Sequence, residues 1–228
     1  MVLSRNTVIK SLILVALTAT LVYGFSFRPP TGFAGCFGEA NCTECHSDNP
    51  IDTGGGMFTL TSPPLEFSPT GENLFSEGYV PNHPYTLVVT LAQSGQRRWG
   101  FELISRFNAN MEQAGDFTAG ADGFTFVQVF ALRGWQYIGH NGAGTFSGTV
   151  DGPVRWVFQW RAPPLSAIPP ADRRITFCGV GNAADNDFGT GGDFIYSLSR
   201  TINPLPGTIP ASDEENGTVV NVLPEGGE

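Results

Sequence analysis

The chain has 228 residues, of which 41% are hydrophobic and only 14% are charged, and it contains 29 Gly and 17 Pro. This composition is typical of one β-rich domain with many turns, and it disfavours a helical protein. The formal net charge of −9 makes nucleic acid an unfavourable partner and a cationic surface a favourable one.

Residues 1–24 are predicted to be an export signal. Arg5 and Lys10 supply its positive charge, and residues 11–22 form an uncharged apolar run that ends near the small residue Gly24. The run is short for a membrane span, which needs about 20 residues, although an uncleaved N-terminal anchor is the alternative. We therefore expect an exported protein of the periplasm or the cell surface.

Residues 25–56 are rich in Gly, Pro and Asn, and they carry the sequence Cys-Thr-Glu-Cys-His at positions 42–46. Cys-x-x-Cys-His is the attachment sequence of a c-type haem. One short turn presents both thiols to the two vinyl groups of the porphyrin, and the adjacent His46 is then placed to take one axial position on the iron. The motif predicts one covalent haem c on Cys42 and Cys45.

A Cys-x-x-Cys pair has three other possible uses. A thioredoxin-type redox pair requires βαβ units, and the sequence has no convincing amphipathic helix. A zinc site requires further Cys or His ligands at a suitable spacing, and none is present. An inert or disulfide-bonded pair is the remaining alternative, and the motif favours haem over all three.

Strand-like runs recur between turn clusters from residue 57 onward. They are 57–61, 85–92, 99–107, 124–132, 135–138, 145–150, 154–160, 175–180 and 194–201. In 154–160 the even positions are all apolar and share one face, which is the period of a half-buried strand. About eight or nine such strands predict an all-β, antiparallel, immunoglobulin-like sandwich over residues 57–202.

Residues 203–228 contain four prolines and the acidic run 213–215. This segment has too little apolar material to pack, so we expect a mobile tail. Asp185, Asp187 and Asp193 form an Asp/Gly-rich turn, for which calcium binding is an alternative use.

Several short sequences distributed along the chain carry a family resemblance. They are Thr31-Gly32 before the motif, Arg98-Trp99-Gly100-Phe101-Glu102-Leu103, Tyr137-Ile138-Gly139-His140, Trp156 to Pro163, Ile175-Thr176-Phe177, Gly181 to Ala184 and Asp193 to Tyr196. With them the chain resembles exported bacterial proteins of the choice-of-anchor V family, in which a Reeler-like β-sandwich follows a haem-attachment segment. It departs from that pattern in Cys36 and in its acidic tail.

His140 is the preferred candidate for the second axial ligand. It follows a predicted strand and opens a turn, and the resemblance includes its Tyr-x-x-His sequence. A histidine in a surface loop is the alternative interpretation. His83 lies beside prolines and is expected to be a turn residue, and Met57 is expected to be a core residue. Met111 is therefore the better methionine candidate for the ligand. Trp135 or Tyr137 could pack on a porphyrin, although a role in the core is the stronger interpretation.

Cys36 and Cys178 remain after the motif cysteines are assigned. In an exported chain a disulfide between them would tie the haem segment to the sandwich, and a free, buried Cys178 is the alternative.

Together these features predict an exported mono-haem c-type cytochrome acting in electron transfer, with a redox protein or membrane-bound complex as its partner. It would be an electron carrier rather than an enzyme, since no catalytic constellation is present. A haem-based sensor or peroxidase-like protein is one alternative. A surface adhesion or matrix module of Reeler type is the other.

Overall fold

The computed structural model describes residues 27–63 and 73–210, and within them nine strands form two sheets. The strands are β1 (Met57–Thr61), β2 (Pro84–Ala92), β3 (Arg98–Phe107), β4 (Asp116–Thr118), β5 (Thr125–Phe130), β6 (Trp135–His140), β7 (Val154–Arg161), β8 (Ile175–Ala184) and β9 (Phe194–Ile202). The sheets have the orders β1-β2-β7-β4 and β5-β6-β3-β8-β9, and every ladder is antiparallel.

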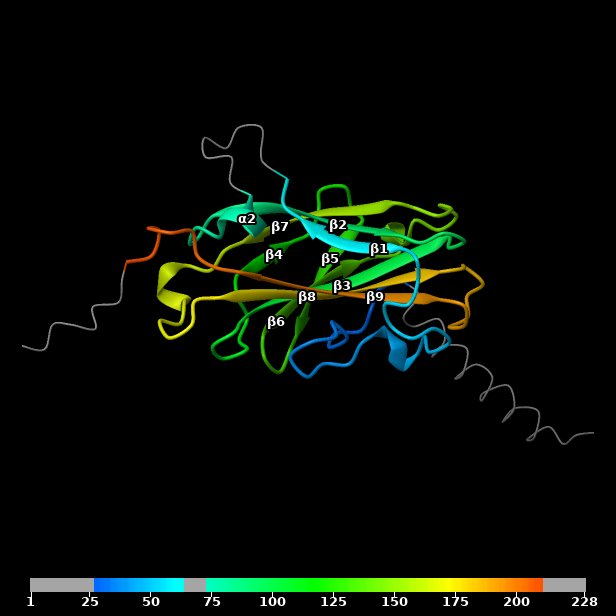
Figure 1. Cartoon of the computed structure of the whole chain (residues 1–228), viewed down its shortest axis with the longest axis horizontal. Coiled ribbons are helices and arrows are strands. Elements are labelled where there is room, and N and C mark those ends of the chain that lie inside the picture. Colours follow the sequence, from blue (N-terminus) through cyan, green and yellow to red (C-terminus); the bar gives the residue numbers. More distant parts are fainter. Residues whose placement is uncertain (1–26, 64–72, 211–228) are drawn as a thin grey trace, which may run out of the picture.

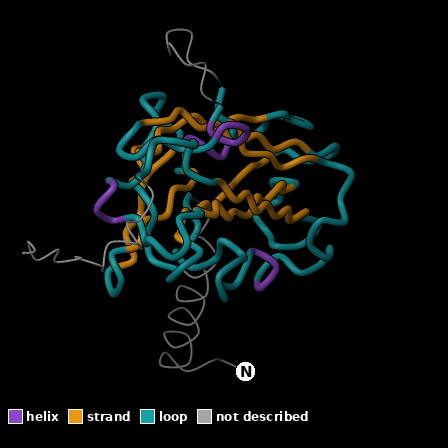
Figure 2. Tube along the Cα trace, turned by 60° about the vertical axis from the view of Figure 1, so that its left-hand side comes forward, coloured by secondary structure: helices purple, strands orange, loops and turns teal. Residues whose placement is uncertain are grey.

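Helices are short and few in the described chain, as Figure 2 shows. They are the α-helix α2 (Leu74–Glu77) and the 3₁₀ turns η1 (Cys42–Glu44), η2 (Ala143–Thr145) and η3 (Leu165–Ala167). The predicted all-β antiparallel sandwich is therefore confirmed.

The two sheets face each other across an apolar core that follows the period-two pattern of the strands. Along β7 every second residue is buried, and these residues are Val154, Trp156, Phe158 and Trp160. Phe101 of β3 meets β7 from the opposite sheet, with its ring centroid 4.7 Å from Trp156 and 6.0 Å from Phe158. Each such side chain stabilises the fold by about 1.5–3 kcal/mol through burial.

Some predicted elements differ in the structure. The strand expected at 145–150 is absent, because Phe146 and Gly148 have positive φ angles of 44° and 91° and turn the chain instead. β6 runs on to His140, so this residue ends a strand rather than opening a turn. The short β4 and α2 were not predicted.

Residues 27–56 cover the outer face of the five-stranded sheet. Figure 1 shows this segment on the side of β6, β3 and β8 that faces away from the other sheet. A second apolar cluster fills the contact, and it consists of Ala34, Ile104, Tyr137 and Cys178 with Cys36, Phe37, Phe130 and Trp135 at its margin. Further along, the Asp52 carboxylate accepts hydrogen bonds from the Ser197 amide and hydroxyl at 2.7 and 2.6 Å. The N-terminal segment is thus a third layer.

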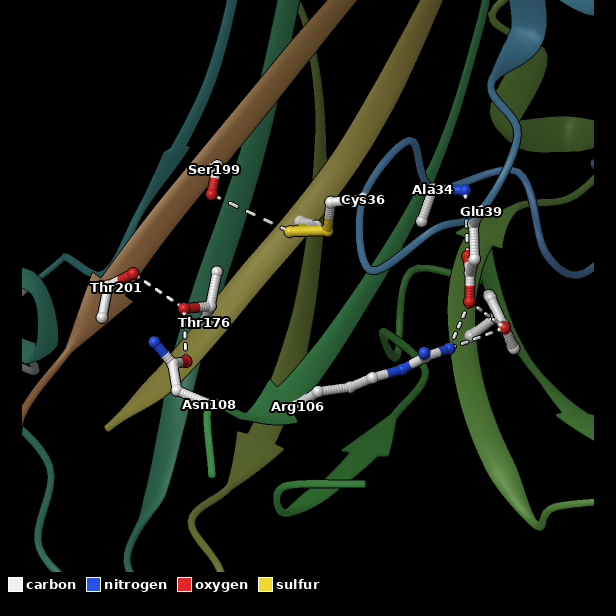
Figure 3. Close-up of a disulfide and its surroundings, with 10 residues drawn as sticks. Ala34, Cys36, Glu39, Arg106, Asn108, Thr176, Ser199 and Thr201 are labelled. Carbon is white, nitrogen blue, oxygen red and sulfur yellow. Dashed lines mark hydrogen bonds and ion pairs between the residues drawn. A yellow bond between two sulfur atoms is a disulfide. The ribbon is translucent and has the colours of Figure 1, made fainter. Parts of the chain in front are cut away.

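A disulfide between Cys36 and Cys178 fixes this layer to β8 (Figure 3). The two cysteines are 142 residues apart in sequence and their Cα atoms are 6.2 Å apart. Structural disulfides occur mainly in oxidising compartments, and this one is consistent with an exported or surface protein.

A buried charged network lies next to the disulfide. Arg106 of β3 reaches out of the sheet and forms an ion pair with Glu39 of the covering segment (Figure 3). The Tyr137 hydroxyl donates to the same carboxylate at 2.6 Å, and Arg106 donates to the Tyr137 oxygen at 3.0 Å. The guanidinium also lies 3.7 Å from the ring centroid of Trp135, so Trp135 and Tyr137 hold the layer in place.

The predicted export signal, residues 1–24, lies entirely outside the described residues. Residues 211–228 of the predicted tail also lie outside them. Of the described residues, no helix is long and apolar enough to cross a membrane. The first part of the tail, 203–210, is described, and the Leu205 amide donates to the Tyr79 carbonyl at 2.8 Å.

We predict that replacing Cys36 and Cys178 by Ser lowers the free energy of unfolding by about 2–4 kcal/mol, because the cross-link no longer restricts the unfolded chain. Urea unfolding with and without reductant measures the loss. The parent should carry Cys42→Ser and Cys45→Ser, so that reductant acts on this disulfide alone. An unfolding midpoint that reductant leaves unchanged would contradict the prediction.

Candidate cofactor site

A cavity of about 560 Å³ lies between the covering segment and one end of the five-stranded sheet. Its walls come from the covering segment, the start of β3, the ends of β6 and β8, and the loop before β9. The lining residues include Pro29, Pro30, Phe33, Cys42, Cys45, His46, Arg98, Gly100, Phe101, His140, Asn182, Phe188 and Asp193. The volume lies within the usual range of about 300–1,000 Å³ for small-molecule and cofactor sites.

The attachment motif forms one tight turn at the edge of this cavity. Asn41 caps η1, and its side-chain oxygen accepts from the Thr43 amide at 2.8 Å. The His46 amide closes the turn by donating to the Cys42 carbonyl at 2.9 Å. As a result Cys42, Cys45 and His46 all line the cavity.

The His46 ring is oriented by Asp193, whose side chain is only 1% exposed. His46 Nδ1 lies 2.5 Å from the Asp193 carboxylate. An ionised carboxylate only accepts hydrogen bonds, so the Nδ1 proton points at Asp193 and the lone pair lies on Nε2, where the Asn182 side-chain amide approaches to 3.4 Å. This carboxylate–histidine arrangement is the usual support of a histidine that binds a metal.

The Cys42 thiol is partly buried, and desolvation, followed by the charges of Glu102 and Cys45, raises its pKa to about 12. A redox-active cysteine pair needs a lowered pKa, because the thiolate is the reactive form. The environment of Cys42 therefore disfavours thioredoxin-type exchange. Cys42 and Cys45 are both free thiols, as attachment to a vinyl group requires.

His140 reaches the cavity from the end of β6. The Phe101 amide donates a hydrogen bond to His140 Nδ1 at 3.0 Å. Gly100 leaves room for the ring, since a Cβ at this position would lie 2.6 Å from His140 Cε1. Burial lowers the pKa of His140 to about 4, so the imidazole is neutral at pH 7. The structure thus brings His140 and His46 to one cavity, and the ligand role of His140 stays a prediction.

The other candidate ligands lie away from the cavity. His83 packs edge-on against Tyr85, with ring centroids 4.8 Å apart. Met111 is exposed in the turn between β3 and β4, and Met57 is also exposed where β1 begins. None of these three is among the residues that line the cavity.

Several cavity residues were missed by sequence reasoning. Asp193 was considered only as part of an acidic turn, but its carboxylate is directed at His46. Asp185 and Asp187 accept from backbone amides of the same turn at 2.9 and 2.6 Å. Arg98 and Phe188 meet at the cavity, with the guanidinium 5.4 Å from the ring centroid. Only the resemblance sequences around Arg98 and Asp193 pointed toward these positions.

Glu102 lies on β3 beneath the covering segment and is 1% exposed. One of its carboxyl oxygens accepts from the Phe33 amide at 2.8 Å, and the other is buried without a hydrogen bond among the described residues. Burial raises the pKa of Glu102 to about 8, although the Phe33 bond acts in the opposite direction. At neutral pH the protonated acid is favoured.

Comparisons with known proteins give only distant structural similarities. No family model and no curated protein matches the chain. The chain is similar to the reeler domain of human F-spondin, at 16% identity over 64% of this chain and 88% of that chain, with a TM-score of 0.36. The Reelin-N domain of F-spondin is 17% identical over 71% of this chain and 96% of that chain, with a TM-score of 0.37. The full-length major pilin SpaD from Corynebacterium diphtheriae is 9% identical over 64% of this chain and 35% of that chain, with a TM-score of 0.37.

The TM-scores of these similarities are below 0.5, so the β-sandwich fold rests on the sheet topology of this chain. Nothing about activity follows from them, and membership of the choice-of-anchor V family stays a prediction.

The prediction of a cytochrome c is wrong as a description of this chain. A cytochrome c is a helical protein, whereas the described residues form two antiparallel sheets and one α-helix of four residues. In the same part of the chain, no group of three or more His, Cys, Asp or Glu side chains is placed to hold a metal ion. The fold is an antiparallel β-sandwich, and the cofactor of its attachment motif is a separate question.

We predict that stability falls as pH rises from about 5 to 8. The folded pKa of Glu102, about 8, exceeds the ordinary value of 4.5, so the folded state binds this proton more tightly than the unfolded state. The contribution is complete below pH 4.5 and is lost as pH approaches 8. Glu102→Gln should flatten this part of the profile of unfolding free energy against pH. An identical slope in the variant and the parent would contradict this assignment.

Proposed function

We propose that this chain is an exported surface module of Reeler type that carries one haem c, held by thioether bonds to Cys42 and Cys45. The carrying observation is that both thiols and His46 line one 560 Å³ cavity. A surface module without such a cofactor has no need to bring two free thiols and an oriented imidazole to the same cavity.

The residues present fit a haem. The porphyrin supplies four ligands to its iron, so the protein supplies at most two and a cluster of three is not required. His46 carries its lone pair on Nε2 because Asp193 accepts the Nδ1 proton, and iron binding there would replace the long 3.4 Å contact with Asn182 Nδ2. When bound, the group would supply redox chemistry or an open coordination position, and this chain would hold and orient it.

The cavity also offers a place for the acidic edge of such a group. Arg98 brings a guanidinium to an otherwise largely apolar wall, and burial lowers its pKa. A partly desolvated guanidinium is stabilised by a nearby carboxylate. The haem propionates are carboxylates of this kind, so Arg98 would be a residue that holds them.

Two uses of the bound group are consistent with an exported module. Electron transfer would require a redox partner protein, which the net charge of −9 would attract if its surface were cationic. Binding of a small ligand, in a sensor or peroxidase-like role, would require an open axial position. Either use is compatible with the periplasm or the cell surface.

We predict that protein expressed with a cytochrome c maturation system retains its haem through acid-acetone extraction. Cys42→Ala with Cys45→Ala should yield haem-free protein, because both thioether bonds are lost. The absorbance of the extracted pellet and the intact mass measure the attachment.

The control is His83→Ala, a residue that does not line the cavity, and this variant should keep the haem. Complete extraction of haem from the unmutated protein would leave the module without a cofactor and overturn the proposal.

A further inference from the structure

The strand pairing between β3 and β6 ends where His140 begins to line the cavity. The ladder has two residue pairs, Glu102 with Gly139 and Leu103 with Ile138. At the next position the His140 ring takes the place of a backbone partner, since the Phe101 amide donates to its Nδ1 at 3.0 Å. The ring is therefore anchored to the sheet by one nitrogen.

This anchor determines which ring nitrogen carries the proton. A backbone amide can only donate, and a buried amide needs an acceptor. The Phe101 carbonyl also lies near Nδ1, but at the longer distance of 3.3 Å. A neutral imidazole has one protonated and one unprotonated nitrogen. Because Nδ1 accepts from Phe101, the proton lies on Nε2.

The Nε2–H group belongs to a ring that lines the cavity. His140 is a lining residue, and its Nε2 makes no hydrogen bond within the part of the chain that the structure describes. Gly100 provides the space that the ring occupies. In this tautomer Nε2 has no lone pair for a metal, and Nδ1 is already engaged.

The two histidines of the cavity are consequently held in opposite tautomers. Asp193 accepts from His46 Nδ1 and leaves a lone pair on Nε2, whereas Phe101 donates to His140 Nδ1 and leaves a proton on Nε2. Both rings reach the same end of the sheet, since His46 lies 3.4 Å from Asn182 and Asn182 pairs with Gly100. One ring can bind a metal, and the other can donate a hydrogen bond.

We propose that His140 is a hydrogen-bond donor to a small diatomic ligand bound in the cavity that it shares with His46, rather than a second axial ligand. The inference rests on the proposed haem and selects ligand binding over electron transfer as its use. Donors in the pocket around a haem decide whether a bound ligand is held or released.

The test uses full-length, haem-loaded protein with carbon monoxide and cyanide as probes. The unmutated ferrous protein should bind carbon monoxide rapidly, because no protein group fills the sixth position. His140→Leu should raise the C–O stretching frequency and speed cyanide dissociation from the ferric protein by about tenfold, the expected effect of one lost hydrogen bond. His140→Gln, which keeps a donor, should restore much of the unmutated behaviour. His83→Leu, away from the cavity, should change neither quantity.

A second measurement reports the tautomer without haem. The ¹⁵N shifts of the His140 ring in the full chain with Cys42→Ser and Cys45→Ser should show a protonated Nε2. A protonated Nδ1 would overturn the inference. So would a low-spin ferric protein that is closed to carbon monoxide and is opened by His140→Ala, since His140 would then be the axial ligand. Protein that retains no haem would instead overturn the proposed cofactor and this role together.

Discussion

The covalent tie between Cys36 and Cys178 is the constraint on which the candidate site depends. A β-sandwich buries the inner faces of its two sheets and leaves the outer faces to solvent. Here the outer face of one sheet is covered by residues 27–56, and the cavity forms between this cover and the sheet. A cover without regular strands has few backbone bonds of its own, so a cross-link and side-chain contacts must hold it in register.

Those contacts are unusually polar for a buried interface. Arg106 and Glu39 form an ion pair under the cover, and Glu102 is buried close by. Removing charges from water is costly, and such groups are kept only when they are paired or neutralised. Arg106 is paired with Glu39 and stacked on Trp135, whereas Glu102 favours its neutral form. The polar groups thus specify one position for residues 27–56 on the sheet. A purely apolar contact would allow several positions of similar energy.

The sequence predicted the parts of the molecule that depend on local patterns. The alternation in 154–160 gave β7 and its buried face correctly, because period-two burial is visible along a single strand. The motif at 42–46 was recognisable because its three functional residues are adjacent. The partnership of Asp193 with His46 was not visible, since it joins residues 147 positions apart. The turn at Phe146 and Gly148 was also missed, because apolar residues there imitate a strand while their φ angles are positive.

The spacing of the cysteines has a consequence for biogenesis. A chain that is exported from its N-terminus presents Cys36, Cys42 and Cys45 together, long before Cys178 emerges. An oxidant that acts at that moment joins two neighbours, and thiol–disulfide exchange must then correct the error. The proposed attachment of haem to Cys42 and Cys45, if it preceded oxidation, would remove both competitors and leave Cys36 with a single partner. The order of these two covalent reactions would then govern the yield of correctly matured protein.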